Sequence, residues 1–193
     1  MAKIILESSN ILSFKGDALI CFCDSDLTLK KYNPILQAFF EKTKSDSSQK
    51  NVVNKSYSQS KEQEDNLLKE LSSIGFCEMG NAVITKAYDI EVKNFIFIPY
   101  LDSDNSENKL NFVLFHHALR AAFTLANLYD VKRLAIPIPR IKVPKKEFMD
   151  KIVSGVFELK KKETLGEKEL TDIITAVSKE FESQSLQEIL IYR

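Results

Sequence analysis

Short apolar runs and segments of helical periodicity alternate along the chain. The runs that predict strands lie at 3–6, 18–22, 81–85, 95–98, 134–138 and 187–192. Each run is short and bounded by polar or turn-forming residues, which is typical of a strand buried in a sheet. Strands that alternate with helices predict a mostly parallel, layered α/β sheet in a single domain spanning residues 1–193.

Helical spacing of apolar residues marks the segments between these runs. It is found at 33–44, in the stretch before Gly75, and at 110–129, 148–159 and 169–181. The strongest pattern is at 110–129, where Phe115, Leu119 and Phe123 recur at i, i+4 spacing. In the segment 33–44 the apolar side comprises Ile35, Leu36, Phe39 and Phe40. We therefore expect helices in all of these segments.

The stretch at 43–65 differs from the rest of the chain in composition. It is rich in Ser, Lys, Gln, Asn and Glu and contributes little to a core, so we interpret it as a polar, mobile insertion. The alternative is a functional arm. The helix that follows is expected to begin at Ser60 or Asp65 and to end at Gly75. Its predicted inward side comprises Leu67, Leu68 and Leu71.

Charge and composition narrow the possible partners. Lys plus Arg and Asp plus Glu both total 27, so the net charge is zero and no overall field attracts nucleic acid or an anionic membrane. No apolar run is long enough to span a membrane, and the N-terminal run is too short for a signal peptide. We expect a cytoplasmic protein without a membrane or nucleic-acid partner.

The cysteines and histidines show no pattern of a metal or catalytic site. Three cysteines are an odd number in a chain large enough to fold without disulfides, which favours reduced thiols. Cys21 and Cys23 share a face of a predicted strand, and Cys77 lies elsewhere. The only histidines, His116 and His117, are adjacent on a predicted helix and point about 100° apart. We expect buried structural cysteines, no metal, no cofactor and no catalytic triad.

Three segments, taken in chain order, are similar to motifs of one known family. The run GFCEMGNAVIT at 75–85 is similar to a "G-E-A-V-I-T" strand, DALICFCD at 17–24 to "D-A-I-V-N-A-A-N", and LAIP at 134–137 to "I-A-F-P". The family they resemble is the macro domain, the α/β module that binds ADP-ribose. The resemblance covers most of the chain and implies a three-layer α/β/α fold with a mostly parallel mixed sheet.

The resemblance also implies which residues face a ligand. The family binds adenine at a "G-D-I" turn after the first strand, and here the matching residues are Ser9, Asn10 and Ile11. Asn10 can accept a hydrogen bond from an exocyclic amine, although without the charge of an aspartate. Where the family's asparagines face the distal ribose, this chain has Cys21 and Asp24. The usual ADP-ribosyl hydrolase activity is therefore not expected, and Asp24 is alternatively a cap or turn former.

Two glycine-rich loops hold the diphosphate in this family, because backbone N–H groups can approach phosphate where no Cβ intervenes. The matching positions here are Lys30, Lys31 and Tyr32 in the first loop and Pro139, Arg140, Ile141 and Lys142 in the second. Proline has no N–H and the other side chains occupy space that glycine leaves open, so ADP-ribose binding should weaken by orders of magnitude. The basic side chains can instead hold an anion by charge, or they are solvated surface cations.

These observations leave two main hypotheses for function. The first is a divergent, non-hydrolytic macro-domain-like protein that binds a nucleotide or another phosphorylated small molecule in a cleft rimmed by the basic loops. The second is a protein-interaction module that kept the fold and lost ADP-ribose binding. An enzyme with altered chemistry centred on Asp24 is a third hypothesis.

Overall fold

The sheet of this protein is mixed and largely parallel. The computed structural model describes residues 2–27, 36, 38–39, 53–88, 91–101, 112–138, 167–180 and 185–192. Within these residues six strands form one sheet in the order β1-β6-β5-β2-β4-β3. The strands are β1 (Lys3–Glu7), β2 (Gly16–Asp24), β3 (Val83–Lys86), β4 (Val92–Leu101), β5 (Arg133–Pro137) and β6 (Glu188–Tyr192). All neighbouring pairs are parallel except the antiparallel pair β3–β4, as the sequence predicts for a mostly parallel mixed sheet.

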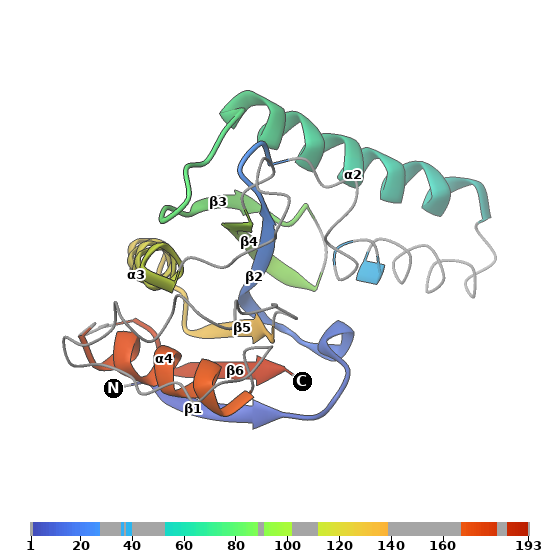
Figure 1. Cartoon of the computed structure of the whole chain (residues 1–193). Helices are drawn as coiled ribbons and strands as arrows, with labels where there is room; N and C mark the ends of the chain where they lie inside the picture. The colour runs from blue at the N-terminus through green and yellow to red at the C-terminus, as the bar shows by residue number, and fades with distance from the viewer. Residues whose placement is uncertain are drawn as a thin grey trace.

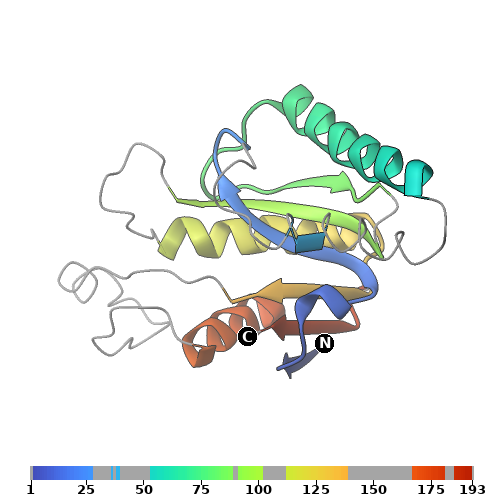
Figure 2. The ribbon, with the colours of Figure 1, turned by 90° about the vertical axis from the view of Figure 1, so that its right-hand side faces the viewer.

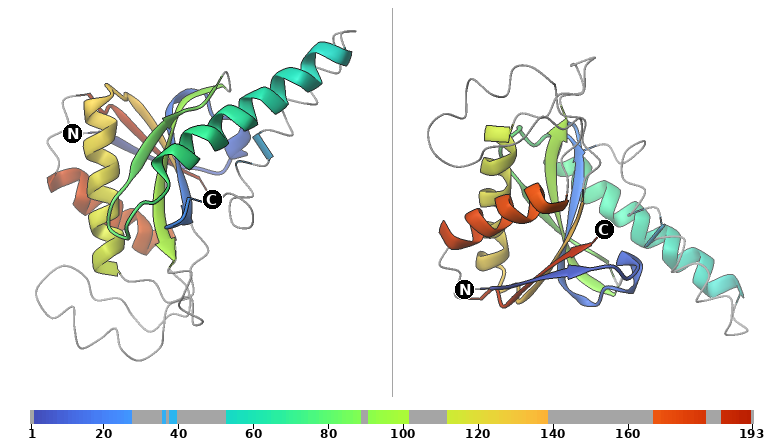
Figure 3. Two further views of the ribbon diagram at one scale, coloured as in Figure 1. Left: turned by 90° about the horizontal axis from the view of Figure 1, so that it is seen from above. Right: turned by 60° about the horizontal axis from the view of Figure 1, so that its bottom comes forward.

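Helices cover both faces of this sheet. They are α2 (Val53–Ile74), α3 (Phe112–Leu128) and α4 (Glu167–Glu180), all labelled in Figure 1. Figure 3 shows α2 on one side of the sheet and α3 and α4 on the other. The predicted three-layer α/β/α architecture is confirmed.

The core is divided between the two faces of the sheet by the alternation of side chains along β2. Ile20 and Phe22 pack on the face that α3 and α4 cover. Leu19, Cys21 and Cys23 pack on the face that α2 covers. Because β2 is buried on both faces, its sequence is a continuous apolar run and not an alternating pattern. Both β2 and β4 extend beyond their predicted bounds of 18–22 and 95–98.

The helix α2 differs from its prediction in two respects. It begins at Val53, ahead of the expected caps at Ser60 and Asp65, so that residues 53–65 of the predicted polar loop are helical. Lys, Gln and Glu are good helix formers, so a composition that excludes core burial does not exclude a helix. Leu67 and Leu71 are buried as predicted, but Leu68 is 42% exposed and its predicted inward position is wrong. Residues four apart share a helix face, whereas the next residue along is turned about 100° away.

Two predicted helical segments lie partly or wholly outside the described residues. Leu36, Ala38 and Phe39 are helical, and Leu36 and Phe39 are buried in the core on the α2 side. The rest of 33–44, the segment 43–52 and the helix predicted at 148–159 lie outside the described residues. The mobility of the insertion remains a prediction.

In the connection from β1 to β2, the aromatic ring of Phe14 packs against Gly16, the first residue of β2. A short 3₁₀ turn, η1 (Ile11–Ser13), leads to Phe14, which is 2% exposed. The Phe14 ring stands edge-on to Tyr192 with 6.0 Å between ring centroids. A Cβ at Gly16 would overlap the Phe14 ring, so the residue that starts β2 has to be glycine.

Asp17 joins the amino ends of three strands. Its Oδ2 accepts hydrogen bonds from the backbone N–H groups of Lys132 (2.9 Å) and Arg133 (3.0 Å), at the start of β5. Its Oδ1 accepts one from Lys93 Nζ on β4 at 2.6 Å. Burial by itself raises the pKa of this carboxyl, but the hydrogen bonds from Lys93, Arg133 and Lys132 outweigh it and lower the pKa below its ordinary value. Asp17 therefore holds β2, β4 and β5 together at the amino edge.

Candidate functional site

The sheet separates between its two central strands, β2 and β5. Over their described lengths these strands pair only at Ala18–Leu134 and Leu19–Ala135, whereas β5 pairs with β6 along its whole length. Figure 2 shows β2 and β5 diverging toward their carboxyl ends. From β5 the chain continues through α4 to β6 on one side, and from β2 it continues through α2 to β3 and β4 on the other. This is a topological switch point, the place where open α/β sheets bind ligands.

Asp24 is the last residue of β2 and lies beside this separation. It is 8% exposed, and its backbone carbonyl accepts a hydrogen bond from Leu27 N at 3.0 Å, which closes a turn with Leu27 at φ 55°. Burial raises the pKa of the Asp24 carboxyl, and the neighbouring Asp26 raises it further. Within the described part of the chain no hydrogen bond or ion pair involves this carboxyl group. Asp24 is thus a turn former through its backbone, and its side chain stands at the carboxyl end of β2, beside the separation of the strands.

The cysteines close to Asp24 are structural. Cys21, Cys23 and Cys77 are all free and buried, as the sequence predicts. Cys77 N donates a hydrogen bond to Ser25 O at 2.8 Å, which ties the segment after α2 to the end of β2. Burial raises the pKa of the Cys77 thiol to about 11, and the pKa of Cys23 is also raised, chiefly by burial. Among the described residues no group of His, Cys, Asp or Glu side chains is arranged to hold a metal ion.

Asn10, which the resemblance assigns to a ligand, stabilises the turn after β1. Asn10 caps η1, and its Oδ1 accepts a hydrogen bond from Leu12 N at 3.0 Å. The backbone carbonyl of Asn10 accepts from both the N–H (2.8 Å) and the hydroxyl (2.7 Å) of Ser13. Ile11 packs against the core on the α2 side of the sheet. The oxygen expected to meet an exocyclic amine is therefore already engaged by the backbone.

Beside this turn Ser9 meets two polar residues that the sequence analysis does not single out, Glu7 and Tyr192. Ser9 Oγ donates a hydrogen bond to Glu7 Oε2 at 3.0 Å, and the Ser9 side chain is also hydrogen-bonded to Tyr192. Burial raises the pKa of the Tyr192 hydroxyl, and the charge of Glu7 raises it further. These residues meet because β1 and β6 pair in parallel, with Glu7 opposite Tyr192. That pairing joins the two ends of the chain, and no local motif indicates it.

The predicted site residues are distributed along the carboxyl edge of the sheet. Asn10 follows β1 and Asp24 ends β2, and β6 and β5 lie between these strands. Where the strands pair, at a spacing of about 4.8 Å, β1 and β2 are about 14 Å apart, and the separation of β2 from β5 increases this distance at the carboxyl edge. The remaining predicted site residues, Lys30, Lys31, Tyr32, Pro139, Arg140, Ile141 and Lys142, lie outside the described residues.

His116 takes part in a contact between two helices. His116 Nε2 lies 3.8 Å from Glu180 Oε1, and Arg120 Nη1 lies 3.5 Å from Glu180 Oε2. These contacts join α3 to α4. His117 is exposed on α3, and its Cβ lies close to Gly80.

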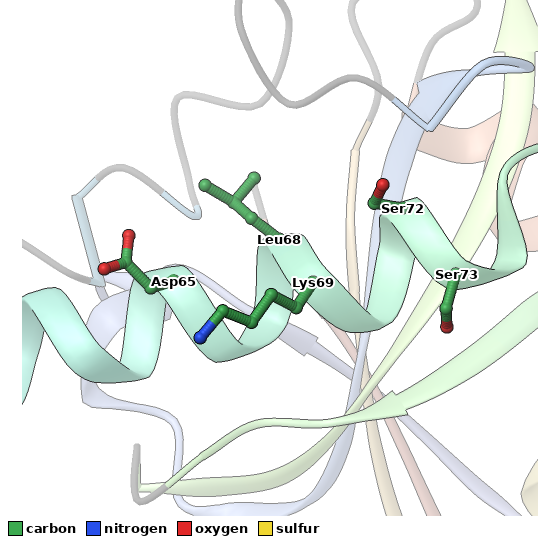
Figure 4. Close-up of a pocket in the computed structure, with 5 residues that line it drawn as sticks. All are labelled: Asp65, Leu68, Lys69, Ser72 and Ser73. Atoms are coloured by element: carbon green, nitrogen blue, oxygen red, sulfur yellow. The ribbon is translucent and has the colours of Figure 1, made fainter.

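A surface depression on α2 does not form a binding site. It is lined by Asp65, Leu68, Lys69, Ser72 and Ser73. Figure 4 shows that these side chains project from one helix in different directions, with Leu68 and Ser73 on opposite sides. The Ser73 hydroxyl donates to the Glu70 backbone carbonyl at 2.7 Å and so serves the helix itself. Convergent polar groups, which a ligand site requires, are missing here.

Comparisons with known proteins agree with this architecture. No family model matches the chain, and no curated protein sequence matches it. Among solved structures it is similar to the macrodomain of Thermus aquaticus DarG, with 10% identity, a TM-score of 0.60, and coverage of 100% of this chain and 99% of that chain. It is also similar to the macro domain of ganglioside induced differentiation associated protein 2, with 13% identity, a TM-score of 0.61, and coverage of 99% and 76%.

A further similar structure contains a ligand. It is the Trypanosoma brucei macrodomain in complex with ADP-ribose, with 13% identity, a TM-score of 0.58, and coverage of 98% of this chain and 62% of that chain. At such low identity the similarity concerns the fold. The chain has the macrodomain fold, as its sequence resemblance predicts. Within the described residues no helix is long and apolar enough to cross a membrane.

Proposed function

We propose that this protein binds a nucleotide or another phosphorylated small molecule at the switch point between β2 and β5. The observation that carries the proposal is the loss of pairing between these strands beyond Leu19 and Ala135, although β2 continues to Asp24 and β5 to Pro137. A ligand in a parallel α/β sheet binds at such a place. A protein of the same fold, the Trypanosoma brucei macrodomain, has been solved in complex with ADP-ribose.

Phosphate binding in this proposal depends on side-chain charge. The two chain segments that follow β2 and β5 contain Lys30, Lys31, Arg140 and Lys142 and no glycine at the matching loop positions. Lysine and arginine bind phosphate by charge-assisted hydrogen bonds, which do not require the close backbone approach that glycine allows. We expect weaker binding of ADP-ribose than glycine-rich loops provide, and selectivity that depends on the anionic group.

The proposed protein is a binder and not a hydrolase. Asp24 stands where the sequence resemblance implies an asparagine, and Asn10 is occupied with capping η1. The supporting observations therefore concern binding alone.

A protein-interaction module is the second candidate. It is favoured by large apolar side chains on the surface, because Phe76 is 59% exposed and Leu68 on α2 is 42% exposed. Figure 3 shows that α2 extends well beyond the sheet that it covers. Exposed apolar groups scattered singly are common on soluble proteins, so they support this candidate less strongly than the separated strands support a ligand site.

Thermal-shift screening separates the two candidates. ADP-ribose, related nucleotides and short oligonucleotides are added to the purified protein, and a ligand that binds the native state raises its melting temperature. The binding proposal predicts a shift with at least one nucleotide. No shift with any of them would favour the interaction module.

Double charge reversal tests which residues hold the anion. K31E/R140E should weaken binding of the nucleotide that shifts the melting temperature by about tenfold or more, because it replaces attraction with repulsion at the phosphate. K3E/K86E is the matched control, since both lysines are exposed and lie on the two edge strands of the sheet. Equal affinities of wild type and K31E/R140E would remove the basic residues from the proposal.

A further inference from the structure

The strand β1 forms one edge of the sheet (Figure 1). Within the described residues it pairs with β6 on one side, and no strand lies on its other side. Lys3 N donates a hydrogen bond to Gln187 O at 2.8 Å, so the backbone groups of Lys3 point toward β6. Successive residues of a strand direct these groups to opposite sides, and the N–H and C=O groups of Ile4 and Leu6 therefore point outward. Such an edge is a template for pairing with another strand.

Side chains along this edge are accessible. Lys3 is exposed, and Leu6 is 44% exposed. Ile4 packs against the core on the side of α3 and α4, and Leu6 shares that face of the strand because side chains alternate. By the same alternation Lys3, Ile5 and Glu7 share the opposite face. The edge therefore presents an apolar side chain on one face and two opposite charges on the other.

The sequence of β1, KIILE, is complementary to a second copy of itself. When two copies run antiparallel with their Ile5 residues opposite each other, Lys3 stands opposite Glu7 of the second copy. In the same register Ile4 stands opposite Leu6, so their outward backbone groups meet as a hydrogen-bonded pair. Opposite charges and apolar side chains directly across antiparallel strands both stabilise the pairing. One register thus satisfies the backbone, the apolar face and the charges.

We propose that β1 binds a second copy of this chain, and that the two strands form an antiparallel pair with a two-fold axis at Ile5. Lysine on an edge strand often prevents such pairing, but here Glu7 of the second copy compensates its charge. Ser9 Oγ already donates to Glu7 at 3.0 Å, and a carboxylate accepts several hydrogen bonds, so Lys3 can bind it as well. The opposite edge strand, β3, contains Lys86 and no acid, and lacks this complementarity.

This contact is separate from the proposed ligand site. The strands β6 and β5 lie between β1 and the separation of β2 from β5. Lys3→Glu should therefore weaken association of the two copies and leave the affinity for a nucleotide unchanged. One short strand from each copy is a small contact, so we expect reversible association and not an obligate dimer.

Charge exchange tests the pairing. Sedimentation velocity of the wild type should show an equilibrium between monomer and dimer that depends on protein concentration. Lys3→Glu and Glu7→Lys should each raise the dissociation constant by about tenfold or more, because like charges then stand opposite each other twice. An equimolar mixture of the two variants restores both attractive pairs and should associate about as tightly as the wild type. Lys86→Glu on β3 is the matched control and should associate like the wild type.

Three results of this experiment would overturn the proposal. The first is a wild type that remains monomeric at about 1 mM. The second is a dissociation constant that Lys3→Glu leaves unchanged. The third is a mixture that associates no more tightly than either variant alone.

Amide hydrogen exchange, followed by NMR, tests the register. The N–H groups of Ile4 and Leu6 should exchange more slowly as the protein is concentrated, because the second copy then accepts their hydrogen bonds. The N–H of Ile5 is bonded within the sheet and should show no such dependence. Leu6→Pro removes one outward N–H without affecting the pairing with β6, so it should weaken association while the melting temperature stays close to that of the wild type. Exchange at Ile4 and Leu6 that is independent of concentration would contradict the pairing.

Discussion

Asp17 shows how one side chain fixes the position of three strands. Its carboxylate accepts hydrogen bonds from two successive backbone N–H groups at the start of β5 and from Lys93 on β4. At the amino edge of the sheet, β2 and β5 are therefore joined by hydrogen bonds to Asp17. At the carboxyl edge the same two strands separate. Asp24 stands at the other end of the same strand, without such partners within the described residues. Of the two aspartates on β2, Asp17 is the one that connects neighbouring strands.

Asp17→Ala should lower the free energy of unfolding by about 1–3 kcal/mol, because the N–H groups of Lys132 and Arg133 lose their acceptor. The folded-state pKa of Asp17 is lowered, so its contribution is present above the unfolded pKa of about 3.9 and is lost as pH falls through the folded value. Urea unfolding of both proteins from pH 7 downward measures this difference. A gap between wild type and variant that stays constant below pH 4 would contradict this role.

The cysteines provide a second prediction at the residue scale. Burial raises the pKa values of Cys23 and Cys77, so few thiolates are present at neutral pH and few are accessible. Iodoacetamide at pH 7 should label the native protein slowly and the urea-unfolded protein at all three cysteines, as measured by mass spectrometry. Rapid labelling of native Cys23 or Cys77 would show that the α2 side of the core opens readily.

At the scale of elements, α2 is a polar helix held by a narrow apolar stripe. Leu67 and Leu71 are buried on the sheet, whereas Leu68 is largely exposed. Tyr88, in the turn after β3, reaches back to the helix through a hydrogen bond of 2.9 Å from its hydroxyl to Glu70 Oε2. Among the exposed side chains described on the helix, Glu62, Asp65, Lys69, Ser72 and Ser73 are charged or hydroxylic, and Leu68 and Ile74 are apolar. Packing and not propensity therefore decides where α2 lies.

Matched leucine substitutions test this stripe. Leu71→Ala should destabilise the protein by about 2–5 kcal/mol, because it leaves a cavity in the core. Leu68→Ala, three residues earlier on the same helix, should change stability by less than about 0.5 kcal/mol. Chemical denaturation measures both. Similar effects of the two substitutions would mean that α2 packs in another rotation.

Most elements could be predicted from the sequence because burial on both faces leaves a plain signature. The apolar run at 18–22 and the helical spacing of Phe115, Leu119 and Phe123 correspond to β2 and α3. The start of α2 could not be predicted, since its first turns carry no apolar periodicity that distinguishes a helix from a loop. The sequence analysis places three leucines on the inward side of α2. Both Leu67 and Leu68 lie three or four residues before Leu71, so spacing alone does not decide which of them faces the sheet.

The candidate site was less predictable, because its features arise from pairings between distant segments. Asn10 was assigned to a ligand by resemblance, but its oxygen caps η1, a local interaction that an asparagine before a turn commonly makes. The contact of Ser9 with Tyr192 joins the two ends of the chain and has no local signature. The sequence analysis identifies Asp24 from the resemblance, while its burial at the end of β2 is visible only in the structure.

At the scale of the whole molecule, the protein has the macrodomain fold and its central strands separate at the carboxyl edge. The structure describes this separation and the position of Asp24 at the end of β2. The basic residues of the segments that follow β2 and β5 are known from the sequence alone. The proposal joins these observations in one claim: a nucleotide or another phosphorylated small molecule binds between β2 and β5.

Amide chemical-shift mapping tests this claim most directly. The nucleotide that raises the melting temperature most is titrated into ¹⁵N-labelled protein, with ADP-ribose as the reference ligand. The account predicts saturable shifts along Leu19 to Asp24 and along Ala135 to Ile138, with little change at Asp65, Lys69 and Ser73 on α2. Saturable shifts confined to α2, or no saturable shifts on either side of the separation, would contradict it.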